Sequence, residues 1–160
     1  MNLHRVALTL LFLFVLSSCT TVQIKNKPEP SPELARREFN QIQADLNNGR
    51  KLSGLKKLSV FTQKYPGTDL ADDAQILRGN VYYEAKDYQN AYDAYISVVK
   101  SNIISPREGE AALYAARCLE RLGRLDEAIS LADKTLASPS NTTETLVGLH
   151  LIKFQAHATL

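Results

Sequence analysis

The side chains that most often carry chemistry are few in this chain and are poorly spaced for catalysis or metal binding. His150 and His157 are seven residues apart in one expected helix, hence about 10 Å apart along its axis, too far to share a metal ion. No phosphate-binding loop, nucleophile elbow or paired-carboxylate pattern occurs in the sequence. We therefore expect no catalytic residue, no metal site and no cofactor, and we expect the protein not to be an enzyme.

Two further groups of reactive side chains have structural interpretations. Asp72 and Asp73 fall near the start of an expected helix, where carboxylates stabilise the positive end of the helix dipole; a metal site is the alternative. Cys118 falls in the helical run AALYAARCLERL, which favours a small buried apolar side chain over a reactive thiol. The other cysteine, Cys19, belongs to the N-terminal signal described below, which leaves Cys118 without a cysteine partner. We therefore expect no internal disulfide.

Cys19 carries the strongest chemical signal. His4 and Arg5 form a basic start, residues 6–16 are almost entirely apolar, and Leu-Ser-Ser-Cys ends at Cys19. The apolar run is too short to span a bilayer as a mature helix. This order of segments is typical of an export signal.

Leu-Ser-Ser-Cys resembles the bacterial lipobox. The resemblance implies cleavage before Cys19, attachment of diacylglycerol to its sulfur and acylation of the new amino group. Each buried methylene contributes about 0.8 kcal/mol, so several acyl chains would hold the protein on a membrane. Thr20 follows the cysteine, and by resemblance to enterobacterial sorting this implies the periplasmic face of the bacterial outer membrane. A plain secretory leader with an incidental cysteine is the alternative.

The segment after Cys19 is rich in proline. Residues 20–32 hold three prolines at alternating positions and lack a usable apolar period, so we expect an extended tether reaching roughly 40 Å in polyproline geometry. The expected organisation is a signal peptide over residues 1–18, the lipidated cysteine and tether over 19–32, and a helical repeat domain over 33–160.

The composition excludes two classes of protein. With 44% apolar and 22% charged residues the chain has ordinary globular composition, which excludes disorder throughout. The formal net charge of +2 falls to about +1 when Arg5 leaves with the leader, since 18 basic residues then face 17 acidic ones. We therefore expect no nucleic-acid partner.

Helical spacing and capping signals predict seven helices in the repeat domain. Their ends are marked by proline at the first position, by Gly or Pro-Gly stops and by a capping box at Ser105-x-x-Glu108, and Asn141-x-x-Glu144 opens the last helix. The expected helices cover residues 32–46, 52–65, 69–85, 88–100, 105–122 and 125–136, and a last one runs from residue 141 to the end of the chain.

These helices repeat along the sequence. A shift of 37 residues aligns Gly49 with Lys86 and Gly123, and it also superposes Gly54, Ala91 and Ala128. Two helices per period, each pair with small residues at matching positions, indicate helical hairpins that stack on their neighbours.

The segment GNVYYEAKDYQNAYDAYISVV, residues 79–99, resembles the tetratricopeptide (TPR) pattern at Gly79, Tyr82, Ala91 and Tyr95. The resemblance extends over residues 31–160, with the first repeat the least similar. It implies an all-α, TPR-like, right-handed α-solenoid of about three and a half helical hairpins with a concave groove. A generic helical bundle is the alternative.

In TPR proteins the first helix of each repeat lines the groove. Carried over by position, the resemblance implies a partner-binding groove formed by Ile76, Asn80, Tyr83, Glu84, Leu113, Arg117, Glu120 and Arg121. Asn80 and Arg117 would contact backbone or carboxylate groups, and Tyr83 would provide a stacking wall. Lysine is absent from positions 76 and 113, which argues against the carboxylate-clamp form of the groove. A solvated polar face without a ligand is the alternative.

The last helix has apolar residues on more than one side. Leu149, Ile152 and neighbours at helical spacing would pack on the third repeat, whereas Leu151, Phe154 and Leu160 lie elsewhere around the helix. Because a terminal helix of a solenoid normally shows water a polar face, we expect these three residues to contact further repeats, a following domain or a partner.

The lipobox, the tether and phrases such as YPGTDLADDAQ are together similar to TPR lipoproteins of the outer-membrane-protein assembly machinery and to TPR proteins that coordinate cell-wall synthesis. The resemblance implies a scaffold that binds another envelope protein at its groove and the membrane through Cys19, in barrel assembly or in peptidoglycan synthesis and cell division. One alternative is the N-terminal TPR module of a longer lipoprotein that activates penicillin-binding proteins. Another is a lipid-anchored envelope hydrolase. The sequence leaves the oligomeric state open.

Overall fold

The computed structural model describes residues 31–101, 105–139 and 141–159. The expected signal peptide, Cys19 and most of the tether lie outside the described residues, as does Leu160. The described part contains seven α-helices and no strand. The helices are α2 (Pro32–Asn47), α3 (Lys51–Lys64), α4 (Asp69–Glu84), α5 (Tyr88–Val99), α6 (Glu108–Arg121), α7 (Leu125–Leu136) and α8 (Thr143–Thr159).

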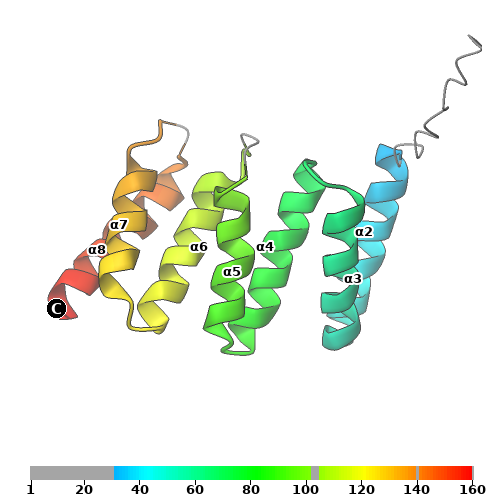
Figure 1. The fold of residues 1–160 in the computed structure, drawn as a ribbon, viewed down its shortest axis with the longest axis horizontal. Helices are drawn as coiled ribbons and strands as arrows, with labels where there is room; N and C mark the ends of the chain where they lie inside the picture. The colour runs from blue at the N-terminus through cyan, green and yellow to red at the C-terminus, as the bar shows by residue number, and fades with distance from the viewer. Residues whose placement is uncertain (1–30, 102–104, 140, 160) are drawn as a thin grey trace, which may run out of the picture.

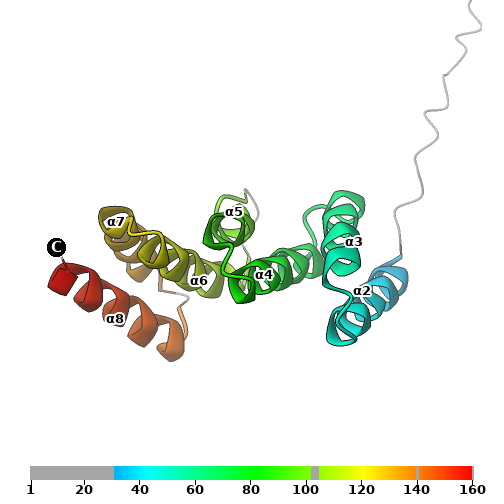
Figure 2. The same cartoon turned by 90° about the horizontal axis from the view of Figure 1, so that it is seen from below.

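The helices form a row of hairpins and not a closed bundle (Figure 1). The pairs α2–α3, α4–α5 and α6–α7 follow one another, and α8 packs on both α6 and α7. Seen from below, α3, α5 and α7 make one layer, and α2, α4, α6 and α8 make the other, which curves to form the concave face (Figure 2). This arrangement confirms the expected all-α solenoid of three hairpins and a single further helix.

The 37-residue repeat is present in the helix boundaries themselves. Helices α3, α5 and α7 begin at Lys51, Tyr88 and Leu125, and helices α2, α4 and α6 end at Asn47, Glu84 and Arg121. Both series advance by 37 residues per step.

The turn inside each hairpin has the same backbone conformation. Gly49, Lys86 and Gly123 take positive φ angles of 78°, 61° and 73°. In the second hairpin the Lys86 N–H donates to the carbonyl of Tyr83 at 2.9 Å, and the next N–H, that of Asp87, donates to Tyr82 at 2.9 Å. These bonds satisfy carbonyls at the end of the first helix, and the equivalent bonds recur at the other two turns.

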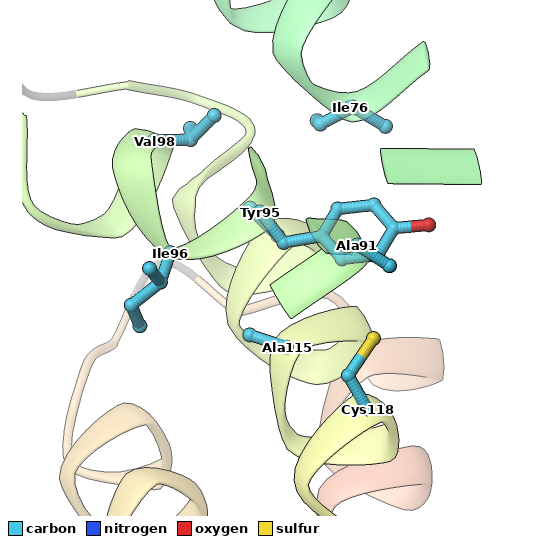
Figure 3. Packing of buried hydrophobic residues seen from close by; sticks show 8 residues of the cluster. Ile76, Ala91, Tyr95, Ile96, Val98, Ala115 and Cys118 are labelled. Carbon is cyan, nitrogen blue, oxygen red and sulfur yellow. The ribbon is translucent and has the colours of Figure 1, made fainter. Parts of the chain in front are cut away.

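The core is divided into clusters that neighbouring hairpins share. Phe39, Leu58 and Phe61 form the centre of the first cluster, and Ala74 of α4 completes it. The second cluster joins α4, α5 and α6 around Tyr95 (Figure 3), and the third joins α6, α7 and α8 around Leu119 and Leu149. Because each cluster draws residues from adjacent hairpins, each hairpin buries its apolar face only by packing on its neighbour.

The predicted starts of α6 and α8 are wrong. The Ser105 hydroxyl accepts from the N–H of Arg107 at 3.1 Å and forms a turn, so α6 begins at Glu108 without a side-chain cap. The N–H of Thr145 donates to the Thr142 hydroxyl at 3.2 Å, so Thr142 and not Asn141 caps α8. The Asn141 amide instead donates to the carbonyls of Thr135 and Ser138 and fastens the loop to the end of α7.

Candidate functional site

Tyr95 connects the core to the concave face. Its ring lies directly over Gly79, where an added Cβ would be 2.4 Å from Tyr95 Cε1, so a glycine is required for this approach of α4 to α5. The ring crosses the hairpin, and its hydroxyl donates to Asn80 Oδ1 at 2.6 Å. Burial raises the pKa of the Tyr95 phenol, which therefore remains a neutral donor.

Two arginines on α6 lie beside tyrosine side chains on this face. The Arg117 guanidinium lies 5.7 Å from the centre of the Tyr114 ring, and the Tyr83 side chain of α4 raises the pKa of the Arg121 guanidinium. Tyrosine neighbours of this kind hold a guanidinium without neutralising its charge. Within the described residues neither arginine forms an ion pair with a carboxylate, so both positive charges remain available to a ligand.

Two hollows open between the helices of the concave layer. The first, of about 250 Å³, lies between α4 and α6 and is lined by Asn80, Tyr83, Glu84, Tyr95, Tyr114 and Arg117. The second, of about 260 Å³, continues toward α8 and is lined by Tyr83, Arg117, Glu120, Arg121, Gly148, Leu151, Ile152 and Gln155. Since Tyr83 and Arg117 line both, the two hollows form one groove across α4, α6 and α8.

A family model for the tetratricopeptide repeat matches residues 76–142, which include most of α4, all of α5, α6 and α7. This segment of the chain is therefore similar to the tetratricopeptide repeat family. The matched segment holds two repeats, the α4–α5 and α6–α7 hairpins, and both of their first helices line the groove. A comparison with curated proteins gives no match.

Six of the eight predicted groove residues line the hollows between the repeats. They are Asn80, Tyr83, Glu84, Arg117, Glu120 and Arg121. Glu84 also accepts from Lys51 Nζ at 3.0 Å, an exposed ion pair between the first and second hairpins. That these residues bind a partner stays a prediction.

The other two predicted groove residues are wrong because both are buried. Ile76 is 3% exposed and packs against Tyr95 and Ala91 in the second core cluster (Figure 3). Leu113 is 4% exposed and is covered by α8, where an added Cβ on Gly148 would lie 2.8 Å from its methyl groups. In both repeats the helix face next to the groove is covered by a neighbouring helix.

Sequence reasoning missed several contributors to the groove, among them Tyr95, Tyr114 and the α8 residues that line the second hollow. Tyr114 has a readable signal, since Tyr114, Arg117 and Arg121 follow helical spacing and lie on one face of α6. Tyr95 belongs to the second helix of its repeat and reaches the groove only because Gly79 leaves room for its ring.

Leu151 and Phe154 of α8 are exposed and so lie away from its packing face, as expected; that they contact a further repeat, a domain or a partner stays a prediction. The 37-residue shift matches the exposed residues Val147, Leu151 and Phe154 with Glu110, Tyr114 and Arg117 of α6, the positions on or beside the groove. Leu151 itself lines the second hollow. The face equivalent to the covered face of α6 holds His150 and Lys153, and the latter pairs with Asp133 of α7. This face of α8 is therefore polar, and the apolar stripe extends the concave face.

The described residues hold little else that could carry chemistry. They contain no group of three or more histidine, cysteine or acidic side chains placed to bind a metal ion. Burial raises the pKa of the Cys118 thiol to about 12, so this cysteine is protonated and unreactive at neutral pH. Among the described helices none has the length and apolar content needed to cross a bilayer.

Proposed function

We propose that this chain is a membrane-anchored scaffold that binds another protein of the bacterial envelope through the groove across α4, α6 and α8. Tetratricopeptide repeats act as protein-interaction modules, and this supports a protein partner of some kind. The observation that carries the proposal is the continuous groove with two arginine side chains that form no ion pair among the described residues.

The groove favours a partner segment that is both acidic and apolar. Arg117 and Arg121 lie one helical turn apart, and the guanidinium group of each would donate hydrogen bonds to a carboxylate. Leu151 offers apolar contact on the neighbouring wall, and Tyr83 presents a ring between the two hollows. A segment with acidic and apolar side chains on one face would satisfy both features.

The envelope location rests on the sequence around Cys19. Leu-Ser-Ser-Cys after an apolar run supports lipid attachment at Cys19, and the proline-rich residues that follow support a spacer between lipid and repeats. Barrel assembly and cell-wall synthesis are the two envelope processes in which the proposed scaffold would act.

Site-directed photocrosslinking in cells tests the groove. A photoreactive amino acid at Tyr83 should crosslink one partner protein, identifiable by mass spectrometry, whereas the same amino acid at Ser130, exposed on α7, should not. Adding Arg117→Glu should abolish the Tyr83 crosslink, and adding Lys134→Glu, an equal change of charge on α7, should leave it. Equal crosslinking from Ser130, or a Tyr83 crosslink that survives Arg117→Glu, would contradict the groove.

Lipid attachment has its own test. Mass spectrometry of the protein purified from a bacterial membrane should show diacylglycerol on Cys19 as the first residue, and Cys19→Ser should release the protein from the membrane fraction. An intact or differently processed N-terminus would contradict the anchor without affecting the crosslinking result.

A further inference from the structure

Charge is divided unequally between the first hairpin and the rest of the row. Residues 32–64, which form α2 and α3, hold seven lysine and arginine residues and three acidic ones, a net charge of +4. Residues 65–160 hold nine basic and thirteen acidic residues, a net charge of −4. The end of the row nearest the N-terminus is therefore basic, and the remainder is acidic.

Helix α3 is the most strongly basic element of this hairpin. It carries four lysines and no acidic residue. Lys57 bonds Asp45 at 2.5 Å and Lys64 bonds Glu38 at 2.5 Å, so these two lysines lie along the border with α2. Lys56 makes no ion pair within the described residues and is exposed.

Exposed apolar side chains flank the free lysine. Leu52 is 86% exposed and Val60 is 56% exposed, and with Lys56 they recur every four residues along one side of α3. Lys56 and Val60 also line a hollow of about 520 Å³ between α2 and α3, together with the buried Ile42 and Phe61. An unpaired lysine between exposed aliphatic side chains, on a helix with no acidic residue, suits a surface that lies on anionic lipid.

We propose that the α2–α3 hairpin rests on an anionic lipid surface through the α3 stripe formed by Leu52, Lys56 and Val60. The positive hairpin is attracted to the negative lipid headgroups, and the negative remainder of the row is repelled by them. The row would then stand with the α2–α3 end against the membrane and the groove away from it. The proposed lipid on Cys19 would add to this contact, because it would keep the hairpin within the reach of the tether from the membrane, but the contact does not depend on that lipid.

Vesicle binding by the full chain carrying Cys19→Ser tests the charge contribution. The chain should bind vesicles of phosphatidylcholine with 30% phosphatidylglycerol more tightly than vesicles of phosphatidylcholine alone, and added salt should reduce the difference. Lys56→Glu should weaken binding to the anionic vesicles at least fivefold. Lys134→Glu makes the same change of net charge on the acidic part of the row and should have less than a twofold effect. Equal loss from both variants would overturn the proposal.

The apolar leader could also bind vesicles, and it is the same in all variants. A fluorophore at a single position shows whether the α2–α3 hairpin itself contacts the lipid. An environment-sensitive fluorophore on Gln63→Cys, exposed on α3, should shift to the blue on anionic vesicles, whereas one on Asp93→Cys, exposed on α5, should not shift. A shift at both positions or at neither would overturn the proposal. The proposal would also be overturned if Lys56→Glu abolished self-association of the protein and left vesicle binding unchanged. The basic hairpin would then bind the acidic part of a second copy and not lipid.

Discussion

The hydroxyl of Tyr95 donates a 2.6 Å hydrogen bond to Asn80 Oδ1 and so fixes the position of a concave-face amide from inside the core. The Tyr95 ring is 2% exposed, whereas Asn80 is exposed. Tyr95→Phe keeps the ring over Gly79 and removes the hydroxyl. We expect a loss of about 1 kcal/mol in the free energy of unfolding, measured by urea denaturation.

A double-mutant cycle shows whether the loss of unfolding free energy comes from the hydrogen bond between Tyr95 and Asn80. Asn80→Ala should cost a similar amount, because it leaves the Tyr95 hydroxyl with a poorer partner. The double variant should cost clearly less than the two single losses combined. Simple additivity would show that Tyr95 and Asn80 act independently.

Lys86 adopts the left-handed conformation that glycine adopts at the matching turns, with a φ of 61°. An L-residue in this region is disfavoured by roughly 1 kcal/mol relative to glycine. Lys86→Gly should therefore stabilise the protein by up to about 1 kcal/mol and raise its melting temperature by a few degrees. The measurement is thermal unfolding followed by circular dichroism.

The reciprocal substitution is a matched control. Gly123 has a φ of 73°, and nothing lies within 4 Å of the position a Cβ would take. Gly123→Lys therefore tests backbone conformation without a steric clash, and it should lower stability by about the amount that Lys86→Gly adds. If both substitutions change stability in the same direction, backbone conformation at the turns is not the cause.

The fold could be predicted from the sequence because equivalent residues recur at the turn of each hairpin. The 37-residue spacing of Gly49, Lys86 and Gly123 fixes where each hairpin turns, and the structure turns at these residues. The starts of α6 and α8 were predicted wrongly, because Ser105 and Asn141 have several backbone groups within reach. Which group such a side chain bonds depends on where the preceding helix ends in space, and local sequence does not specify that.

Part of the groove was predictable, because the 37-residue repeat shows which positions of successive repeats lie on the same face. Asn80 and Arg117 are 37 residues apart, and both line the first hollow. Leu113 was misplaced because its burial depends on α8, which approaches closely only where Gly148 lacks a side chain. Contacts between repeats are thus set by the neighbouring repeat, and the pattern within one repeat does not reveal them.

Asp45 couples the stability of the first hairpin to pH. Lys57 and Arg50 both donate to its carboxylate, at 2.5 Å and at 2.5–3.1 Å, and these hydrogen bonds lower its pKa below the ordinary value of 3.8. A carboxyl group with a lowered folded-state pKa stabilises the fold above its unfolded pKa and loses that contribution as pH falls through the folded pKa. Stability should therefore decline from about pH 4 downward.

Substitution of Asp45 isolates its share of the acid sensitivity. Asp45→Asn should be less stable than the parent chain at pH 7, and the difference should shrink as the pH is lowered from 5 to 2. The exposed Asp93 of α5 supplies the comparison, since Asp93→Asn should leave the pH profile of the parent nearly unchanged. A constant difference between parent and Asp45→Asn across this range would contradict the role of the Asp45 carboxylate.

Cys118 should report on unfolding because its thiol is buried beside Tyr95 in the core between the second and third hairpins (Figure 3). Burial raises its pKa from 9.0 to about 12, which lowers the thiolate fraction at pH 8 by about a thousandfold. In the chain carrying Cys19→Ser, iodoacetamide should therefore label Cys118 far more slowly than an exposed cysteine introduced by Gln63→Cys. Labelling should become rapid in urea at the concentration where circular dichroism shows the helices unfold. Rapid labelling in buffer, with the helices intact, would show that the junction between the second and third hairpins opens on its own.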